Sequence, residues 1–174
     1  MKNCLAFLSL LLLFSCGGVR VNYDYEKTTD FTQYKTYNYY ANLNTGLSEL
    51  DNKRLLDALD DAMTAMGYSL AEHPDFFVDI KSSEYQEPSR NNVGVGIGGT
   101  GRNVGGGVSI GIPVGQSNIS RQIVFEFIDE NKAGLFWQAV SESSYNPKAS
   151  PEKREALFKA IVTKVFEGFP PEIK

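Results

Sequence analysis

Residues 120–128 read SRQIVFEFI, and the alternation of apolar and polar side chains in this stretch decides the expected fold class. Neighbouring side chains on a β-strand point to opposite sides, so the pattern predicts a strand with one buried face. That apolar face consists of Ile123, Phe125 and Phe127. Residues 129–134 predict a hairpin loop, and the following residues 135–145 (LFWQAVSESSY) predict the partner strand. An antiparallel hairpin is therefore the expected centre of the fold.

Three further segments have the character of strands. Residues 19–25 (VRVNYDY) alternate apolar and polar side chains strictly, which predicts a strand with one buried face. Residues 31–39 are rich in aromatic and β-branched side chains, and residues 76–81 (FFVDIK) predict another short strand. Together with the hairpin, these segments predict a sheet of about five strands.

A first helix is predicted to begin after Ser48. This residue type is typical of a helix N-cap, and Asp51 stands three residues later as a short capping-box partner. Apolar residues then recur at helical spacing up to Gly67, a residue type typical of helix ends. They are Leu50, Leu55, Leu56, Leu59, Ala62, Met63 and Met66. The polar face carries three aspartates, which we expect to lie in solvent rather than in a metal or acid–base site: Asp57, Asp60 and Asp61.

A second helix is predicted near the C-terminus. Ser150 followed by Pro151 is typical of an N-cap and a first helical residue, and Gly168 with the following prolines ends the pattern. Its apolar stripe consists of Leu157, Phe158, Ile161, Val162, Val165 and Phe166. The order of elements predicts an α+β fold: one largely antiparallel sheet of about five strands, a glycine-rich β-hairpin, and two helices packed on one face. Two helices are too few to cover both faces of the sheet.

Residues 93–115 read VGVGIGGTGRNVGGGVSIGIPVG and are the most unusual part of the chain. Aliphatic and glycine residues alternate twice, which predicts a hairpin of two strands that each have one aliphatic face. Such strands are weakly held in register, and an exposed aliphatic edge suits pairing with another protein. The candidate partner-binding residues are Val95, Ile97, Val108 and Ile110. The alternative interpretation is a mobile loop without a function.

The first sixteen residues, MKNCLAFLSLLLLFSC, predict a lipoprotein signal. Lys2 precedes an apolar run of about ten residues, which fits the core of a signal peptide and is too short to span a bilayer. The run ends in Leu13-Phe14-Ser15-Cys16, which resembles the bacterial lipobox. This resemblance implies removal of residues 1–15 and lipidation of Cys16, with residues 16–18 as the lipidated cysteine and tether. The alternatives are a short membrane anchor and an ordinary secretory signal.

Composition narrows the classes of function that remain. Cleavage before Cys16 leaves 159 residues, enough for one domain over residues 19–174, with 16 basic and 21 acidic side chains and a net charge of −5. No run of like charge suggests binding to nucleic acid. The only cysteines are Cys4 and Cys16, so the mature fold has no disulfide, cysteine metal site or cysteine nucleophile. His73 is the only histidine, so no metal site or cofactor is predicted.

Aromatic residues offer the other candidate site. On the uncovered face of the sheet, tyrosine and tryptophan rings could stack on a sugar or another small ligand. The candidate ligand-binding residues are Tyr34, Tyr37, Tyr39 and Trp137. The competing interpretation is that they pack in the sheet and the core.

Several short motifs, in this order, resemble the bacterial lipoproteins classed as domain of unknown function 4136. The motifs are Tyr23-Asp24-Tyr25, Asp30-Phe31-x-x-Tyr34-Lys35-Thr36-Tyr37, Gly67-Tyr68, Pro74-Asp75-Phe76-x-Val78, Trp137 and Phe169-Pro170-Pro171. They cover about residues 20–171, and Tyr39 departs from the tryptophan expected after the tyrosine run. The resemblance implies a fold and a location in the envelope. The family has no established activity, so no catalytic residue is carried over.

The expected function is that of a lipid-anchored envelope protein. No aspartate follows Cys16, which by resemblance to enterobacterial lipoprotein sorting implies the outer membrane. No acidic cluster resembling a surface-export signal follows either, so we expect the domain to face the periplasm. The protein is expected to be a structural or protein-interaction module with another envelope protein as its partner and without catalytic activity. A small-ligand or glycan-binding lipoprotein is the alternative.

Overall fold

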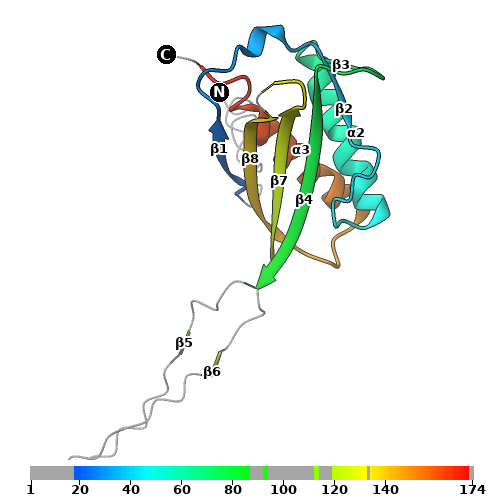
Figure 1. Cartoon of the computed structure of the whole chain (residues 1–174). Coiled ribbons are helices and arrows are strands. Elements are labelled where there is room, and N and C mark those ends of the chain that lie inside the picture. Colours follow the sequence, from blue (N-terminus) through cyan, green and yellow to red (C-terminus); the bar gives the residue numbers. More distant parts are fainter. Residues whose placement is uncertain (1–17, 87–91, 94–111, 114–118, 133, 173–174) are drawn as a thin grey trace, which may run out of the picture.

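The structure is a computed structural model that describes residues 18–86, 92–93, 112–113, 119–132 and 134–172 (Figure 1). Eight strands, two α-helices and one 3-10 helix form in these residues. The strands are β1 (Arg20–Tyr25), β2 (Thr36–Tyr39), β3 (Ser69–Leu70), β4 (Phe76–Gln86), β5 (Asn92–Val93), β6 (Ile112–Pro113), β7 (Ile119–Asp129) and β8 (Gly134–Tyr145). The helices are α2 (Glu49–Ala65), α3 (Pro151–Phe166) and a 3-10 turn (Phe31–Gln33).

The main sheet has six strands in the order β1-β8-β7-β4-β2-β3. The predicted hairpin of β7 and β8 forms its second and third strands, and β4 and β1 pair antiparallel on either side of it. The expectation of about five largely antiparallel strands is corrected here, because β2 runs parallel to both β3 and β4. The chain passes through α2 between β2 and β4, and a long crossover of this kind allows parallel pairing. The predicted α+β class is confirmed.

Both helices cover the same face of the main sheet, as expected, and leave the other face toward the viewer in Figure 1. Helix α2 begins after Ser48, whose hydroxyl accepts a hydrogen bond from the Asp51 backbone N–H at 3.4 Å. Helix α3 begins after Ser150 with Pro151 at its first turn. Gly67 has a φ of +89° just after α2, a conformation that glycine adopts without strain.

The core lies between the sheet and the two helices. The predicted inward residues Ile123, Phe125 and Phe127 are fully buried there. The register of β7 and β8 shifts between Phe127 and Ile128, so both Phe136 and Trp137 are buried although they are neighbours in sequence. An extra residue in one strand of a pair changes the direction of the side chains that follow it.

The predicted glycine-rich hairpin is described only at its base. There β5 and β6 pair antiparallel in a separate two-stranded sheet, with Asn92 opposite Pro113 and Val93 opposite Ile112. The candidate partner-binding residues Val95, Ile97, Val108 and Ile110 lie outside the described residues, as does Cys16. Among the helices that are described, none has the length and apolar character needed to cross a membrane.

Candidate functional site

The candidate ligand-binding aromatics belong mostly to the core. Tyr34, Tyr37 and Trp137 are 3%, 1% and 0% exposed, and Tyr39 is half-buried against the core. The strand register turns Tyr37 and Trp137 toward the helix-covered face. Their register partners on the neighbouring strands are the buried Phe76 and Phe127, respectively. The Trp137 indole N–H also donates to the Gly168 carbonyl at 3.2 Å. These rings therefore do not form the expected exposed aromatic face.

The hydroxyls of the three tyrosines bind carboxylates. Tyr34 donates to Asp129 at 3.0 Å, while Tyr37 and Tyr39 donate to Asp60 at 2.7 and 2.6 Å. Burial, followed by the hydrogen bond to a carboxylate, raises the pKa of each tyrosine above its ordinary value of 10.0. Asp60 was predicted to lie on a solvated face, but it is half-buried and anchors β2 to α2.

A polar cluster at one end of the sheet is the candidate site, and its first member is Arg121. Its side chain is 6% exposed and lies on the same face of β7 as Ile123 and Phe125. The guanidinium carbon is 3.6 Å from the centre of the Tyr145 ring, and Nη2 donates to Glu84 at 2.6 Å. Its Nε is buried and has no hydrogen-bond partner among the described residues. Arg121 is therefore a buried cation whose donors are only partly used.

Asp51 is the carboxylate at the centre of this cluster, and it is 1% exposed on its side chain. Oδ2 accepts from Arg154 Nη1 at 2.6 Å and lies 3.6 Å from Arg121 Nη1, while Oδ1 accepts from Arg54 Nη1 at 2.9 Å. The predicted capping-box role is corrected, because the Asp51 carboxylate is occupied by arginines. We define Asp51, Arg54, Arg121 and Arg154 as the arginine cluster.

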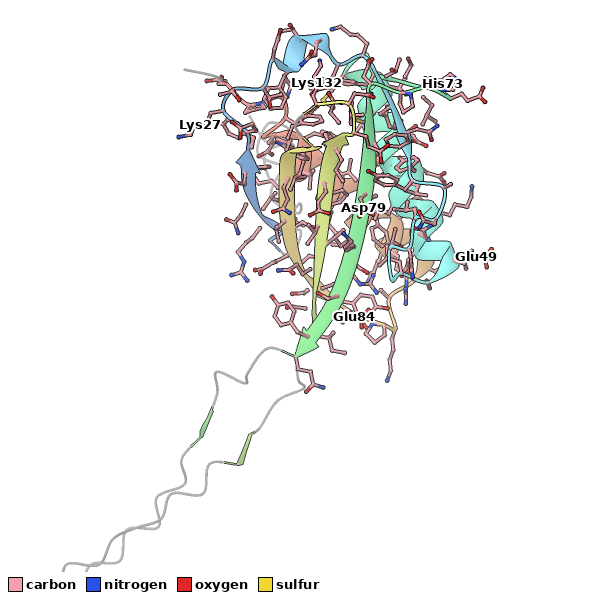
Figure 2. The ribbon with its side chains drawn as sticks, in the orientation of Figure 1. Lys27, Glu49, His73, Asp79, Glu84 and Lys132 are labelled. Carbon is pink, nitrogen blue, oxygen red and sulfur yellow. The ribbon has the colours of Figure 1, made fainter. Side chains whose placement is uncertain are left out.

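The secondary structure brings the arginine cluster together at one end of the molecule. Asp51 and Arg54 lie in the first turns of α2, Arg154 lies in the first turn of α3, and Arg121 lies near the start of β7. Arg154 also donates to the carbonyls of Pro147 and Ala149, at 2.7 and 3.2 Å, and so holds the loop that precedes α3. Figure 2 shows Glu84, the partner of Arg121, at the far end of β4 from His73 and Lys132.

A cavity of ≈ 400 Å³ lies beside the arginine cluster. Its wall combines charged residues with apolar residues from α3 and the preceding loop. The lining residues are Asp51, Arg121, Ser144, Tyr145, Asn146, Ala149, Lys153, Arg154, Ala156, Leu157 and Phe158. This volume falls within the usual range for small-molecule sites, and we call it the arginine-lined cavity.

The described lining of the cavity has an excess of positive charge. Arg121, Arg154 and Lys153 line it together with a single carboxylate, that of Asp51, and outside the lining Arg121 also pairs with Glu84. Two helices also begin at this point, and the backbone N–H groups of a helix N-terminus attract anions. The described residues contain no group of three or more histidine, cysteine or acidic side chains placed to hold a metal. The arrangement therefore suits a bound anion better than a cation.

The second candidate surface is the uncovered face of the main sheet with its β1 edge. Lys81 pairs with Asp79 at 2.8 Å and with Glu126 at 3.2 Å on this face, and Gln138 donates to Glu126 at 2.9 Å. Strand β1 pairs with β8 on one side and with no described strand on the other. This makes β1 an edge of the described sheet, the kind of position at which another strand can be added.

The arginine cluster was not predicted from the sequence, although one signal pointed to it. Arg121 has the same parity as Ile123, Phe125 and Phe127, so the alternation that predicts β7 also places an arginine on its buried face. A buried arginine requires an anionic partner. Nothing local identifies Asp51 as that partner, because it is 70 positions away and also fits a capping pattern.

Comparisons with known proteins identify a sequence family and similar folds. The sequence model of "Domain of unknown function (DUF4136)" matches residues 21–171. A single-substitution variant of the PelC dodecamer from Paraburkholderia phytofirmans is similar over 89% of this chain and 99% of that chain, with a TM-score of 0.52 and 8% identity. A PDZ domain protein from Parabacteroides distasonis is similar over 97% of this chain and 40% of that chain, with a TM-score of 0.53 and 11% identity. No curated protein matches the sequence.

Proposed function

Because the chain belongs to the DUF4136 family, we propose that it is a lipid-anchored protein of the outer membrane that acts by binding other proteins, copies of itself included. The proposed position is the periplasmic face, with lipid on Cys16. The observation that carries the proposal is the β1 edge, which pairs with no described strand on one side. A similar fold occurs in a protein that forms a dodecamer.

The anchor is supported by residues 1–16, which combine a short apolar run with a lipobox-like cysteine. Two or three acyl chains hold a protein stably at a membrane, because each buried CH₂ contributes about 0.8 kcal/mol. Arg20, the first residue of β1, follows Cys16 by only four positions. Four extended residues span at most about 14 Å, so the β1 edge stays close to the membrane surface.

Assembly through the β1 edge is supported by its position and its side chains. Anchored copies are confined to one surface, which raises the effective concentration of neighbouring edges. Asn22, Tyr23 and Asp24 of β1 are exposed, and polar residues of this kind allow a reversible contact without causing aggregation. The uncovered sheet face continues from this edge and offers a second surface for a partner.

We also propose that the protein has no catalytic activity. The sequence has one histidine, and both cysteines precede the domain. His73 is exposed at one end of the sheet, far from the arginine cluster at the other end (Figure 2). A mechanism of general acid–base or nucleophilic catalysis requires such groups to converge.

In-cell photo-crosslinking of the full chain tests this proposal. A photoreactive residue is placed at Asn22 or Asp24 on the β1 edge, at Val95 or Ile110 in the glycine-rich segment, or at Glu72 as an exposed control. We expect discrete adducts from the β1 positions. Their masses should be either multiples of the mass of this chain or the sum of this chain and one envelope protein. Val95 and Ile110 test whether the glycine-rich segment binds the same partner. Loss of membrane association in Cys16→Ser tests the anchor separately.

Two results would contradict the proposal. If Asn22 and Asp24 give no more adduct than Glu72, the β1 edge is not a binding surface. If the Cys16→Ser chain remains in the membrane fraction, and the native chain does not incorporate labelled lipid, lipid anchoring through Cys16 is contradicted.

A further inference from the structure

We infer that the arginine-lined cavity binds a small carboxylate with an apolar tail. This inference is independent of the proposed function, because it concerns the opposite side of the sheet from the uncovered face. It begins from an excess of cations around a buried carboxylate. Arg54, Arg121 and Arg154 surround Asp51, Glu84 is the one further carboxylate bound to Arg121 among the described residues, and the exposed Lys153 lines the same cavity. Buried charges in proteins are normally paired.

The remaining hydrogen-bonding capacity lies on Arg121. Its Nη2 binds Glu84 and its Nη1 is 3.6 Å from Asp51, which is longer than a hydrogen bond. Its Nε, fully buried, has no partner among the described residues. The Tyr145 ring lies against the guanidinium at 3.6 Å and keeps it from turning toward solvent. A held guanidinium with unused donors is prepared to bind an anion.

The shape and chemistry of the site favour a carboxylate. A guanidinium presents parallel donors that match the two oxygens of a planar carboxylate, and Arg121 and Arg154 are brought together by Asp51. Lys153 adds an exposed cation at the rim, where it can draw in an anion. The start of α3 contributes its positive end to the same region.

The rest of the cavity favours an apolar tail. Ala149, Ala156, Leu157 and Phe158 are apolar lining residues, and three of them lie on successive positions of α3. A simple inorganic anion gains nothing from such a wall, whereas an acyl or aryl chain is removed from water by it. An acyl carboxylate combines a carboxylate that binds the arginines with a chain that packs against the apolar wall.

The test uses the full chain in nanodiscs and a photoreactive probe, a diazirine-bearing medium-chain aliphatic carboxylate. The matched control probe is the primary amide of the same molecule, which keeps the tail and lacks the charge. After irradiation, mass spectrometry locates the adducts on the chain. We expect labelling of the segments that contain Tyr145 and Leu157, and about tenfold less labelling by the amide. Inorganic phosphate at equal concentration is expected to compete weakly.

Two pairs of matched variants separate binding from folding. Ala156→Phe fills the cavity from an exposed helical position, and Ala65→Phe makes the same change at an exposed position of α2 outside it. Lys153→Gln removes a cavity cation, and Lys159→Gln removes an exposed cation of α3 that does not line the cavity. We expect about tenfold less labelling in Ala156→Phe and several-fold less in Lys153→Gln, with the controls within about twofold of the native chain.

Three results would overturn the inference. Equal labelling by carboxylate and amide would show that the arginines do not select the ligand. Unchanged labelling in Ala156→Phe, with the adducts elsewhere on the chain, would place binding outside the cavity. Phosphate that competes as strongly as the carboxylate would reduce the site to a general anion site.

Discussion

The Oδ2 atom of Asp51 lies 2.6 Å from Nη1 of Arg154, which is 103 residues further along the chain. This contact joins the first turn of α2 to the first turn of α3, and Arg54 and Arg121 complete the set of cations around the same carboxylate. The arginine cluster thus connects both helices to the sheet at the end where the cavity lies.

Replacement of Asp51 by asparagine is expected to destabilise the fold by about 3 kcal/mol. The substitution leaves Arg121 and Arg154 without their shared anion, and breaking one side of a buried ion pair is costly. Urea unfolding at neutral pH, followed by circular dichroism, measures the change. Asp57→Asn is the control, because the Asp57 side chain is 64% exposed and Lys53 is its one ion-pair partner among the described residues, so a loss below about 0.5 kcal/mol is expected. Equal losses in the two variants would contradict the role of Asp51.

Asp75 joins two of the family motifs that are separated in sequence. Its Oδ2 accepts from the backbone N–H groups of Lys35 and Thr36, each at 2.8 Å. Burial opposes ionisation of Asp75, but these bonds and one with the Thr36 side chain outweigh it and lower its pKa from 3.8. Asp75→Asn is expected to cost about 1 kcal/mol at pH 7, a modest value because the site is exposed to water.

The Asp75 contribution also predicts a pH dependence. A carboxyl with a lowered pKa in the folded state stabilises the fold above its unfolded pKa, and this stability is lost as pH falls through the folded pKa. The difference between the native chain and Asp75→Asn should therefore be constant above about pH 5 and shrink below about pH 4. Urea unfolding across this range measures it, with the exposed Glu72→Gln as control. A difference that persists unchanged to about pH 2 would contradict the assignment.

Gly168 is required where the Tyr23 ring crosses the end of α3. A Cβ at position 168 would lie 2.5 Å from two ring carbons of Tyr23. Because the Tyr23 hydroxyl donates to the Lys164 carbonyl, the ring is held in place. Gly168→Ala is expected to cost about 1–3 kcal/mol, the usual range for overpacking.

A double-mutant cycle tests the contact between Gly168 and Tyr23. In a Tyr23→Ala background the clash is absent, so Gly168→Ala should then cost less than about 0.5 kcal/mol. Gly18→Ala is the control, because nothing lies within 4 Å of its Cβ position. Additive losses from Gly168→Ala and Tyr23→Ala would show that the ring is not the cause.

The two tyrosines that bind Asp60 predict a loss of stability at alkaline pH. Burial and the hydrogen bonds to Asp60 raise the pKa of Tyr37 and Tyr39 in the folded state. Stability from such groups is complete below the unfolded pKa of about 10 and falls as pH rises above it. Above about pH 10, the free energy of unfolding of the double variant Tyr37→Phe with Tyr39→Phe should fall less steeply with pH than that of the native chain. From about pH 7 to 9 the two free energies should change in parallel. If the free energies of unfolding of the native chain and the double variant fall with the same slope above the tyrosine pKa of the unfolded chain, this prediction is contradicted.

The sequence by itself determined the elements that depend on local periodicity and local backbone chemistry. Alternation in residues 19–25 and 120–128 predicted strands, and Ser48, Gly67 and Ser150 marked helix ends, all as observed. These features follow from hydrogen bonds and side-chain directions within a few residues. The family motifs predicted membership over nearly the whole domain, and the sequence model matches residues 21–171.

Only the tertiary structure decided which side chains meet. Parallel pairing of β2 with β4 depends on the path of the chain through α2, and the burial of Tyr37 and Trp137 depends on strand register. The Asp51–Arg154 contact joins residues that are 103 positions apart, and a pattern that spans a few residues cannot predict a contact at that separation. Long-range pairing of charges follows from packing, which is why the sequence predicted helix α2 and missed the arginine-lined cavity at its start.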